Sequence, residues 1–266
     1  MIGRLFGPLA AMACLALMIW PGAAARAAEP GCRPDMASLS PRVTLASLNA
    51  DEARITFVGH ATFLIESARG VTAATDYNDY VRAARTPAIA TMNKAHSTHY
   101  SRNPESGITH LLRGWDPAGG RAAHDVTEGD MRVRNVPTNI RSFSGATDFD
   151  GNSIFIFEIG ELCIVHLGHL HHTLEPGHLR AIGRADVLLV PVDGGYTLDM
   201  EGMFEVIKHL QPRIIIPMHF FGQATLERFL TRASADWPVQ RRDTATITVS
   251  RATLPPGPTV LVLPGR

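Results

Sequence analysis

The first half of the chain contains four short apolar runs, each rich in β-branched or aromatic residues and each followed by polar or glycine positions. Runs of this kind predict β-strands. They are Arg54–Gly59, Thr62–Glu66, Val71–Thr75 and Ala88–Met92. The first three follow one another closely and predict a β-meander, whereas residues 76–87 show no clean period and predict a loop.

The middle of the chain is more polar and gives weaker signals. Residues 101–130 are rich in glycine, proline and polar groups, with one helical candidate over Glu105–Trp115. Met131–Val136 alternates apolar and polar positions, as a half-exposed strand does. Ser153–Ile159 and Leu162–Leu167 predict a hairpin, which turn-forming residues 148–152 separate from the preceding strand.

The pattern changes again in the C-terminal half, where apolar residues recur three or four positions apart. This spacing predicts helices, and the continuous apolar runs between them predict buried strands. The expected helices cover 174–182, 200–207 and 226–233, and the strands cover 187–190, 213–216, 244–250 and 259–263. Strands that alternate with helices of this length indicate β-α-β units.

The N-terminus has the three-part layout of a secretory signal peptide. Arg4 precedes an apolar run from Leu5 to Trp20, and small residues ending in Ala25-Arg26-Ala27 follow it. A membrane anchor is the alternative, but the run is shorter than the roughly 20 residues that a spanning helix needs. We therefore predict a signal peptide over residues 1–27, a lead-in over 28–52, and an exported, periplasmic protein with no stable membrane insertion.

Charge and cysteine content narrow the class of protein further. The chain has 25 basic and 25 acidic residues, so no basic excess points to nucleic acid as a partner. A small-molecule substrate is expected instead. Once a signal peptide is removed, Cys32 and Cys163 remain. They could pair in an oxidising compartment, or Cys163 could simply be a buried apolar residue of a strand.

Four of the twelve histidines directly follow apolar runs, and this placement carries more information than their number. They are His96, His99, His169 and His219. Loops that leave strand ends are where ligands gather in layered α/β folds. Neutral imidazole suits divalent transition metals, and a nitrogen-rich ligand set favours zinc, with manganese or iron as alternatives. We predict that these four histidines bind metal, although within the run 166–172 the ligand could be any of four histidines.

Other histidines receive different expectations. His60 lies in a Gly-His-Ala turn, where it forms either a polar wall of the pocket or an ordinary hydrogen-bonded contact. His171 and His172 are candidates for acid-base groups or for partners of the metal ligands. The remaining isolated histidines are expected at the surface: His110, His124, His178 and His209.

Several blocks of the sequence resemble the metallo-β-lactamase superfamily, in its branch of lactonase-like and phosphodiesterase-like hydrolases. They are ITFVGHATFLIES with ATDY, the KAHSTH loop, GNSIFIFEIGELCIVHLGHLHH, ADVLLVPVDGGYTLD and RIIIPMHFF. The resemblance implies an α/β fold over residues 53–266: an αββα sandwich of two mixed β-sheets flanked by helices. It also implies loops that hold one or two metal ions to activate a water.

The chain departs from the signature of that superfamily, His-x-His-x-Asp-His, at two positions. Lys94 stands in place of the first histidine and Thr98 in place of the aspartate. Thr138-Asn139 replaces a further histidine, and His169 replaces an aspartate. Thr98 and His169 stand where the superfamily has carboxylates that bridge two ions. We therefore expect a mononuclear site.

These residues lead to one leading function and two alternatives. We expect an exported metal-dependent hydrolase of an ester, lactone or phosphodiester bond. Lys94 would stabilise a developing oxyanion, and His171 or His172 would act as the base. The altered loop also allows a catalytically inactive member of the same fold that binds a metal or ligand. A third possibility treats the histidines as purely structural.

Overall fold

The computed structural model describes residue 3, residues 51–142 and residues 144–265. Apart from Gly3, Asp51 and Glu52, the predicted signal peptide and lead-in lie outside the described residues. Cys163 is disulfide-bonded, and Cys32, which the sequence offered as a possible partner, also lies outside them. Within the described part of the chain, no helix is long and apolar enough to cross a bilayer.

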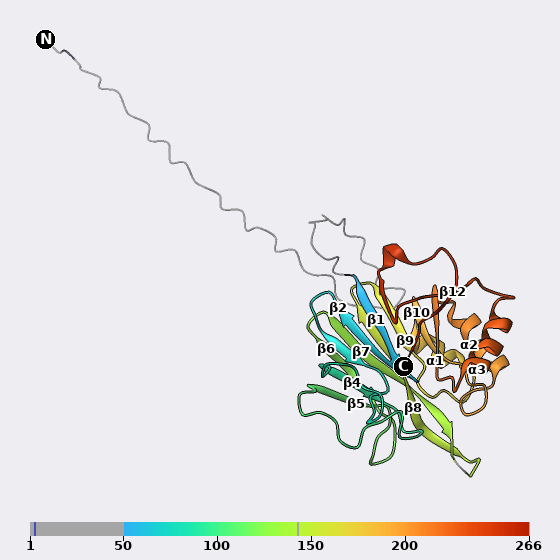
Figure 1. The fold of residues 1–266 in the computed structure, drawn as a ribbon. Helices are drawn as coiled ribbons and strands as arrows, with labels where there is room; N and C mark the ends of the chain where they lie inside the picture. Colours follow the sequence, from blue (N-terminus) through green and yellow to red (C-terminus); the bar gives the residue numbers. More distant parts are fainter. Residues whose placement is uncertain (1–2, 4–50, 143, 266) are drawn as a thin grey trace.

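Two mixed β-sheets form the body of the molecule (Figure 1). The six-stranded sheet has the order β13-β1-β2-β3-β4-β5. In chain order its strands are β1 (Ala53–Gly59), β2 (Thr62–Ser67), β3 (Thr72–Ala74), β4 (Ile89–Met92), β5 (His110–Arg113) and β13 (Thr246–Val249). The predicted β-meander is confirmed, because β1, β2 and β3 pair antiparallel in sequence.

The second sheet has eight strands in the order β12-β14-β11-β10-β9-β8-β7-β6. They are β6 (Asp125–Glu128), β7 (Met131–Arg141), β8 (Thr147–Ile159), β9 (Leu162–His166), β10 (Val187–Pro191), β11 (Ile214–Met218), β12 (Val239–Arg241) and β14 (Thr259–Val262). The predicted hairpin is confirmed as the antiparallel pair β8 and β9. The short edge strands β6 and β12 were not predicted.

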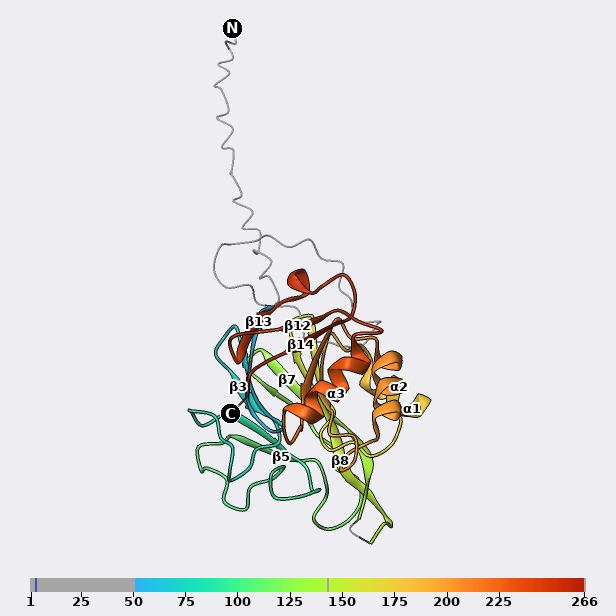
Figure 2. The same cartoon turned by 45° about the vertical axis from the view of Figure 1, so that its right-hand side comes forward.

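Three α-helices are described: α1 (Pro176–Ile182), α2 (Met200–Leu210) and α3 (Gln223–Ala233). A 3-10 turn, η2 (Arg251–Thr253), precedes β14. The helices α1 and α2 connect β9 to β10 and β10 to β11, and these strands pair in parallel. The predicted β-α-β units are therefore confirmed. All three helices pack on the eight-stranded sheet, on the side away from β3 and β5 (Figure 2).

Side chains alternate between two apolar layers along the buried strands. In β8, Phe155 and Phe157 face the six-stranded sheet, whereas Ile154 and Ile156 face the helices. Ile215 and Ile216 of β11 divide between the same two layers. A strand buried on both faces reads as a continuous apolar run, as predicted for these segments. The expected sandwich of two sheets with helices is confirmed.

The helical candidate Glu105–Trp115 is wrong, because its centre forms β5. This strand pairs in parallel with β4, with His110 opposite Ile89. An apolar cluster on the six-stranded sheet packs against Ile108, Leu111 and Trp115. It consists of Ala74, Tyr77, Ala90 and Met92. Glycines at positions 107 and 114 leave too few residues between them for a helix. Pairing with the open edge of β4 therefore determines the conformation.

The turn predicted at residues 148–152 is also wrong, because these residues lie inside β8. The strands β7 and β8 continue to Arg141 and Thr147, past a bulge between Thr138 and Ile140. Asp150 has a φ of 53°. The Asp-Gly pair that signalled a turn is thus accommodated by the irregular part of the ladder, which continues to the pair of Arg141 with Thr147.

One edge of the sandwich collects the polar strand ends. The parallel strands β9, β10 and β11 end at His166, Pro191 and Met218, and the loops that follow them carry His169, Asp193 and His219. From the six-stranded sheet, β3 and β4 also pair in parallel. They lead into Asp76 and into the loop that contains His96 and His99. The topology therefore brings six chemically active side chains from both sheets to the same edge.

Candidate metal centre

Four histidines meet at this edge with their ligand atoms within 4.8 Å of one another: His60, His96, His99 and His219. Three of them belong to the predicted metal-binding set. His60 comes from the turn between β1 and β2, where the sequence predicted a polar wall or a structural contact. His169, the fourth predicted ligand, lies next to this group, with its Nε2 3.0 Å from His96 Nε2.

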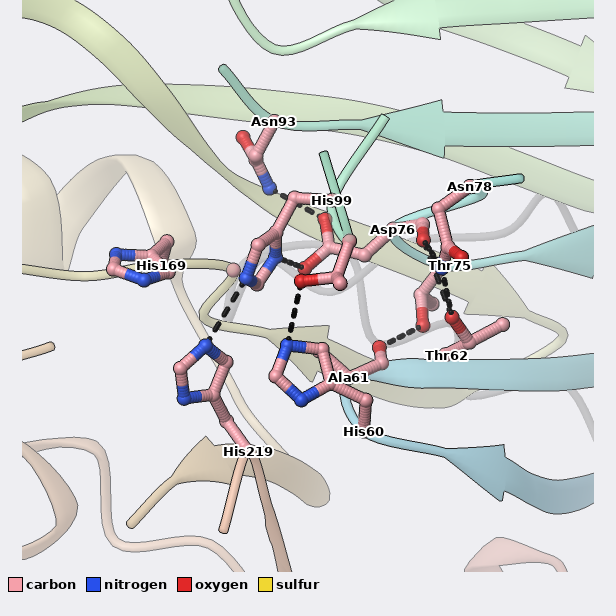
Figure 3. Close-up of polar contacts among 12 residues, drawn as sticks. His60, Ala61, Thr62, Thr75, Asp76, Asn78, Asn93, His99, His169 and His219 are labelled. Carbon is pink, nitrogen blue, oxygen red and sulfur yellow. Dashed lines mark hydrogen bonds and ion pairs between the residues drawn. The ribbon is translucent and has the colours of Figure 1, made fainter. Parts of the chain in front are cut away.

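Two buried carboxylates orient two of the rings. His99 Nδ1 lies 2.5 Å from Asp76 Oδ2, and His219 Nδ1 lies 2.9 Å from Asp193 Oδ1. A carboxylate accepts hydrogen bonds, so each imidazole carries its proton on Nδ1 and keeps a lone pair on Nε2. Figure 3 shows His99 between Asp76 and His219. The two Nε2 atoms face each other at 3.1 Å.

This pair of facing lone pairs fits a bound cation. Two neutral imidazoles gain nothing from such a contact, because neither Nε2 carries a hydrogen to donate. A tetrahedral ion with metal–nitrogen bonds of about 2.0–2.1 Å separates its nitrogen ligands by about 3.3 Å. The 3.1 Å between His99 Nε2 and His219 Nε2 is close to that value. The donor set therefore fits a divalent metal such as zinc.

The backbone is held in unusual conformations where these side chains enter the site. His60, Asp76 and His219 have positive φ angles of 53°, 40° and 55°. Residues other than glycine rarely adopt this region, and such conformations cluster at functional sites. The His219 amide donates to the His60 carbonyl oxygen at 2.7 Å. The end of β11 is thus joined directly to the β1–β2 turn.

Thr98 connects two more rings of the cluster. Its hydroxyl oxygen lies 2.8 Å from His96 Nδ1 and 2.9 Å from His60 Nε2. The residue that replaces an aspartate of the resembled signature is therefore an orienting group here. A hydroxyl both donates and accepts, so Thr98 can serve the two histidines at once.

Burial keeps the histidines neutral, which is the form that binds metal. Burial, with repulsion from His219 and His96, lowers the pKa of His60 to about 3. Burial also lowers the pKa of His96 and places that of His99 well below its usual value. The pKa of His169 is lowered for the same reason.

The two orienting carboxylates are shifted in opposite directions. Burial raises the pKa of Asp76 to about 6, against the Asn93 side-chain hydrogen bond that favours the charged form. Burial also opposes ionisation of Asp193, but hydrogen bonds from His219 and Thr197 outweigh it and lower its pKa. Both groups are carboxylates at neutral pH, so each can hold a proton on the Nδ1 of its histidine.

The predicted catalytic residues lie around the cluster in different situations. The Lys94 ammonium pairs with Asp148 at 2.7 Å and is about half exposed. His172 Nε2 accepts from the Asn139 amide at 3.1 Å, and its Nδ1 lies 2.7 Å from the Thr173 carbonyl oxygen. Both nitrogens of His172 thus contact the backbone. A base or oxyanion role for either residue stays a prediction.

His171 is the predicted catalytic residue with a direct link to the cluster. Its Nε2 lies 2.6 Å from His169 Nδ1, and its Nδ1 accepts from the Arg141 amide at 2.8 Å. The Arg141 guanidinium also donates to the carbonyl oxygens of residues 195, 196 and 197. Arg141 therefore holds the end of β7 against the loop that follows Asp193.

The sequence predicted no contact with the histidines for Asp76, Thr98 or Arg141, and it suggested only a substrate contact for the turn that begins at Asp193. The available signal for the two aspartates was their position, because each directly follows an apolar strand, as the histidines do. The role of Thr98 depends on the rotation of two neighbouring rings. That of Arg141 depends on the bulged β7–β8 ladder. Neither could be derived from a linear pattern.

Comparison with known proteins agrees with this architecture. The family model described as the Beta-lactamase superfamily domain matches residues 54–219. The chain belongs to this family. Among solved structures, a Thermotoga maritima protein of the metallo-β-lactamase superfamily superposes with a TM-score of 0.59 at 25% identity, over 80% of this chain and all of that one. The expected superfamily is therefore confirmed.

Two curated relatives belong to the group named UPF0173. A UPF0173 metal-dependent hydrolase of Thermoplasma acidophilum is 34% identical over 34% of this chain, and the match spans only 40% of that protein. A UPF0173 protein of Pyrococcus abyssi is 24% identical over 66% of this chain and 88% of its own length. The β-lactamase superfamily domain thus accounts for most of the described part of the chain.

Proposed function

We propose that this protein is a metal-dependent hydrolase that uses one histidine-bound divalent ion, with zinc the first choice, to cleave a carboxylic ester or lactone. The observation that carries the proposal is the pair of Nε2 atoms of His99 and His219, which face each other at 3.1 Å while carboxylates hold their Nδ1 protons. Similarity to a relative named a metal-dependent hydrolase supports the same activity.

The residues around the site would hold the ion and orient its ligands. When bound, the ion supplies a Lewis acid and a water of lowered pKa, near 7 for zinc in open sites. Asp76 and Asp193 fix the rings of His99 and His219, and Thr98 fixes that of His96. Because the cluster offers no described carboxylate among its own ligand atoms, a mononuclear site is favoured over a binuclear one.

The cations near the site favour an uncharged substrate. Lys94 pairs with Asp148, Arg141 donates to three carbonyl oxygens, and Arg228 donates to the Asp193 carbonyl oxygen at 3.1 Å. Phosphodiester hydrolysis needs positive charge to neutralise the phosphate. These three cations are already engaged, so esters and lactones are favoured over phosphodiesters.

An aromatic pair beside the histidines suggests which substituent the substrate carries. Phe221 is 60% exposed and Tyr196 is 69% exposed, and their rings meet edge to face at 5.3 Å. Phe221 also lies 5.3 Å from the His219 ring and 5.7 Å from the His60 ring. Exposed aromatic surface next to a site favours an apolar or planar group there. We infer an ester or lactone with an aryl or alkyl substituent.

Metal analysis and a substrate panel test this function. Protein purified without a histidine tag should carry about one divalent ion per chain and should hydrolyse neutral aryl or alkyl esters or lactones faster than an aryl phosphodiester. His219→Ala should lose both the ion and the hydrolysis. Hydrolysis that persists without a bound ion would contradict the proposal, as would a parent protein that binds the ion and cleaves none of these bonds.

Export to an oxidising compartment is the second part of the proposal. The predicted signal peptide supports it, as does the disulfide bond at Cys163, since disulfides persist mainly outside the cytosol. Expression of the full chain in a Gram-negative host should give a mature protein that begins near Ala28 and is released with the periplasm. An uncleaved N-terminus in the cytoplasmic fraction would contradict export.

A catalytically inactive metal-binding protein is the second candidate function. It is favoured by one observation: the Lys94 ammonium is paired with Asp148, and the Thr98 hydroxyl is shared by two histidines. Neither side chain therefore supplies a base for hydrolysis at the metal site. The double variant Lys94→His with Thr98→Asp separates the two candidates. Hydrolysis by the double variant alone would favour an inactive parent, whereas hydrolysis by the parent would favour the enzyme.

A further inference from the structure

The backbone amide of Arg141 determines where the proton of His171 lies. This amide lies 2.8 Å from His171 Nδ1, and the Arg141 side-chain Nε lies 3.2 Å from the same atom. Both groups only donate hydrogen bonds. His171 Nδ1 must therefore be an acceptor, because a hydrogen on it would face two N–H groups. The single proton of the neutral ring lies on Nε2.

The same reasoning applies to the next ring. His171 Nε2 lies 2.6 Å from His169 Nδ1, so its hydrogen is donated to that atom. A hydrogen on His169 Nδ1 would collide with it. His169 therefore carries its proton on Nε2. The hydrogen bond that Arg141 donates to His171 therefore also determines which nitrogen of His169 carries the proton.

His169 Nε2 lies at the cluster, 3.0 Å from His96 Nε2. It donates there, so His96 carries its own proton on Nδ1 and gives it to the Thr98 hydroxyl oxygen at 2.8 Å. The Thr98 hydroxyl then donates to His60 Nε2 at 2.9 Å. Every hydrogen bond in this series is donated in the same direction, from Arg141 towards His60.

His169 consequently differs from the histidines beside it. His99 and His219 present lone pairs on Nε2, because Asp76 and Asp193 hold their Nδ1 protons. His96 also presents an Nε2 lone pair. These three histidines belong to one cluster and would form a three-histidine donor set, which in catalytic zinc sites leaves one coordination position open. His169 alone among these four presents an N–H.

We propose that His169 is a hydrogen-bond donor aimed at the three-histidine site, not a metal ligand, and that Arg141 fixes it in this form through His171. The inference deepens the proposed hydrolase function and rests on it for the identity of the substrate. With His96 as a ligand of a bound ion, the His169 N–H would no longer have the His96 lone pair as acceptor. It would then be available to donate to an oxygen of the substrate.

This arrangement gives His169 the role predicted for Lys94. A fixed N–H beside the reacting group stabilises negative charge that develops on a carbonyl oxygen during ester hydrolysis. The donor needs no proton transfer to do so. Arg141 and His171 are positioning residues in this account, because they act only by setting which nitrogen of His169 is protonated.

Nuclear magnetic resonance of the metal-free protein tests the tautomers directly. Long-range ¹⁵N–¹H spectra at pH 7.5 distinguish the two neutral forms of each ring. We expect Nε2–H for His169 and His171, and Nδ1–H for His99 and His219. Single His→Gln variants assign the signals. An Nδ1–H signal for His169 would overturn the proposal, whatever the activity of the enzyme.

A carboxylate at position 171 should reverse the direction of the hydrogen bond between residue 171 and His169. In His171→Glu the new side chain can only accept, so His169 would move its proton to Nδ1 and gain an Nε2 lone pair. We expect the Co²⁺ form to change from three nitrogen ligands and one oxygen to four nitrogen ligands, and Zn²⁺ affinity to rise about tenfold or more. His209→Glu, the same charge change on the exposed face of α2, should leave both unchanged.

Two outcomes of this experiment contradict the proposal: four nitrogen ligands in the parent, or an unchanged ligand set in His171→Glu. Removal of His169 gives an independent check. His169→Ala should keep about one ion per chain with affinity within about threefold, while its kcat falls and its KM is retained. A loss of affinity as large as that of His99→Ala would make His169 a ligand.

These readouts separate this inference from the proposed function. The tautomer and the ligand count are measured without substrate. If no ester or lactone is cleaved, the proposed function fails and the hydrogen-bond chain can still be confirmed. If His169 proves to be a ligand, this inference fails and the hydrolase function is unaffected.

Discussion

The residue that best explains the proposed metal centre is Asp76, although it is not one of the proposed ligands. It is fully buried at the end of β3 and bonds both His99 Nδ1 and the Asn93 side-chain amide. Its negative charge keeps the His99 proton on Nδ1 and so keeps the Nε2 lone pair directed at His219. Partners of this kind fix both the tautomer and the orientation of a metal-binding histidine.

Removing the charge of Asp76 should therefore weaken metal binding. Asp76→Asn keeps the size of the side chain but loses the carboxylate, and we expect the Zn²⁺ dissociation constant to rise about 10- to 100-fold. Competition with a chromophoric chelator measures it. Asp236→Asn, which changes an exposed ion pair with Lys208 and Arg232, is the matched control and should have no effect. Equal affinities for all three proteins would contradict the role of Asp76.

Phe221 provides a residue-scale test of the substrate class. If its ring packs on the substituent of the substrate, Phe221→Ala should raise the KM for an aryl ester about fivefold, as loss of roughly 1 kcal/mol of aromatic contact requires. The kcat should change little, because the metal ligands are untouched. Phe149→Ala removes an aromatic ring that is 75% exposed on β8 and serves as the control. Identical KM values for both variants would argue against an aromatic subsite.

At the scale of elements, the connection after β9 is the most constrained part of the site. Gly168 has a φ of 61° and precedes His169. A Cβ atom there would collide with the side chains of Asn93 and Asn152 and lie 3.1 Å from the Ser153 carbonyl oxygen. Asn93 in turn donates to Asp76 at 2.9 Å. The turn after β9 is thus packed against the group that orients the metal ligand.

Gly168→Ala should accordingly damage both stability and the site. We expect the free energy of unfolding to fall by about 2 kcal/mol or more, from backbone strain and overpacking together, and metal affinity to fall with it. Gly177→Ala is the matched control, because a Cβ at this position of α1 meets nothing within 4 Å. That variant should be neutral or slightly more stable. Denaturant unfolding of the two variants checks the difference, and equal stabilities would contradict it.

Elements with a strong local pattern were predictable from the sequence, and those set by pairing were not. Strands such as β10 and β11 are continuous apolar runs, so their burial between two layers could be predicted. The strand β5 carried helical spacing but pairs with the edge of β4. The bulge between β7 and β8 absorbed an Asp-Gly turn signal. Contacts between distant segments decided both cases.

The residues of the site divide in the same way: some could be predicted from local sequence patterns, and others depend on contacts between distant segments. His96, His99 and His219 were predicted to meet because they follow apolar strands, and the structure brings them together. For His60 the sequence left a polar wall of the pocket and a structural contact as alternatives, since its proximity to the site depends on how the β1–β2 turn lies against the end of β11. The relation of His169 to the cluster depends on the rotation of individual rings. A linear sequence carries no information on such rotations.

For the whole molecule, the buried histidines should make the metal-free protein sensitive to acid. Burial lowers the pKa of His60 to about 3, and burial with Arg141 lowers that of His171 to about 4. The unfolded chain therefore binds more protons than the folded protein below about pH 6.5, so stability falls as pH falls. Asp76, with its pKa raised to about 6, takes up a proton in the folded protein and offsets part of this loss.

Urea unfolding of the metal-free protein between pH 7.5 and 5 measures this dependence. We expect the free energy of unfolding to decrease by more than about 1.4 kcal/mol per pH unit in the lower part of that range, since more than one histidine contributes. Saturating Zn²⁺ should raise the free energy of unfolding without flattening this slope, because the histidines are already neutral in the folded protein. A stability that is constant or increases towards pH 5 would contradict neutral, buried histidines.

The central claim is that one divalent ion is held by His99 and His219 together with His96. Calorimetric titration of untagged, metal-free protein with Zn²⁺, combined with native mass spectrometry, tests it most directly. We predict one ion per chain for the parent, and loss of this binding in both His99→Ala and His219→Ala. No bound ion, two ions per chain, or unchanged binding in either variant would contradict it.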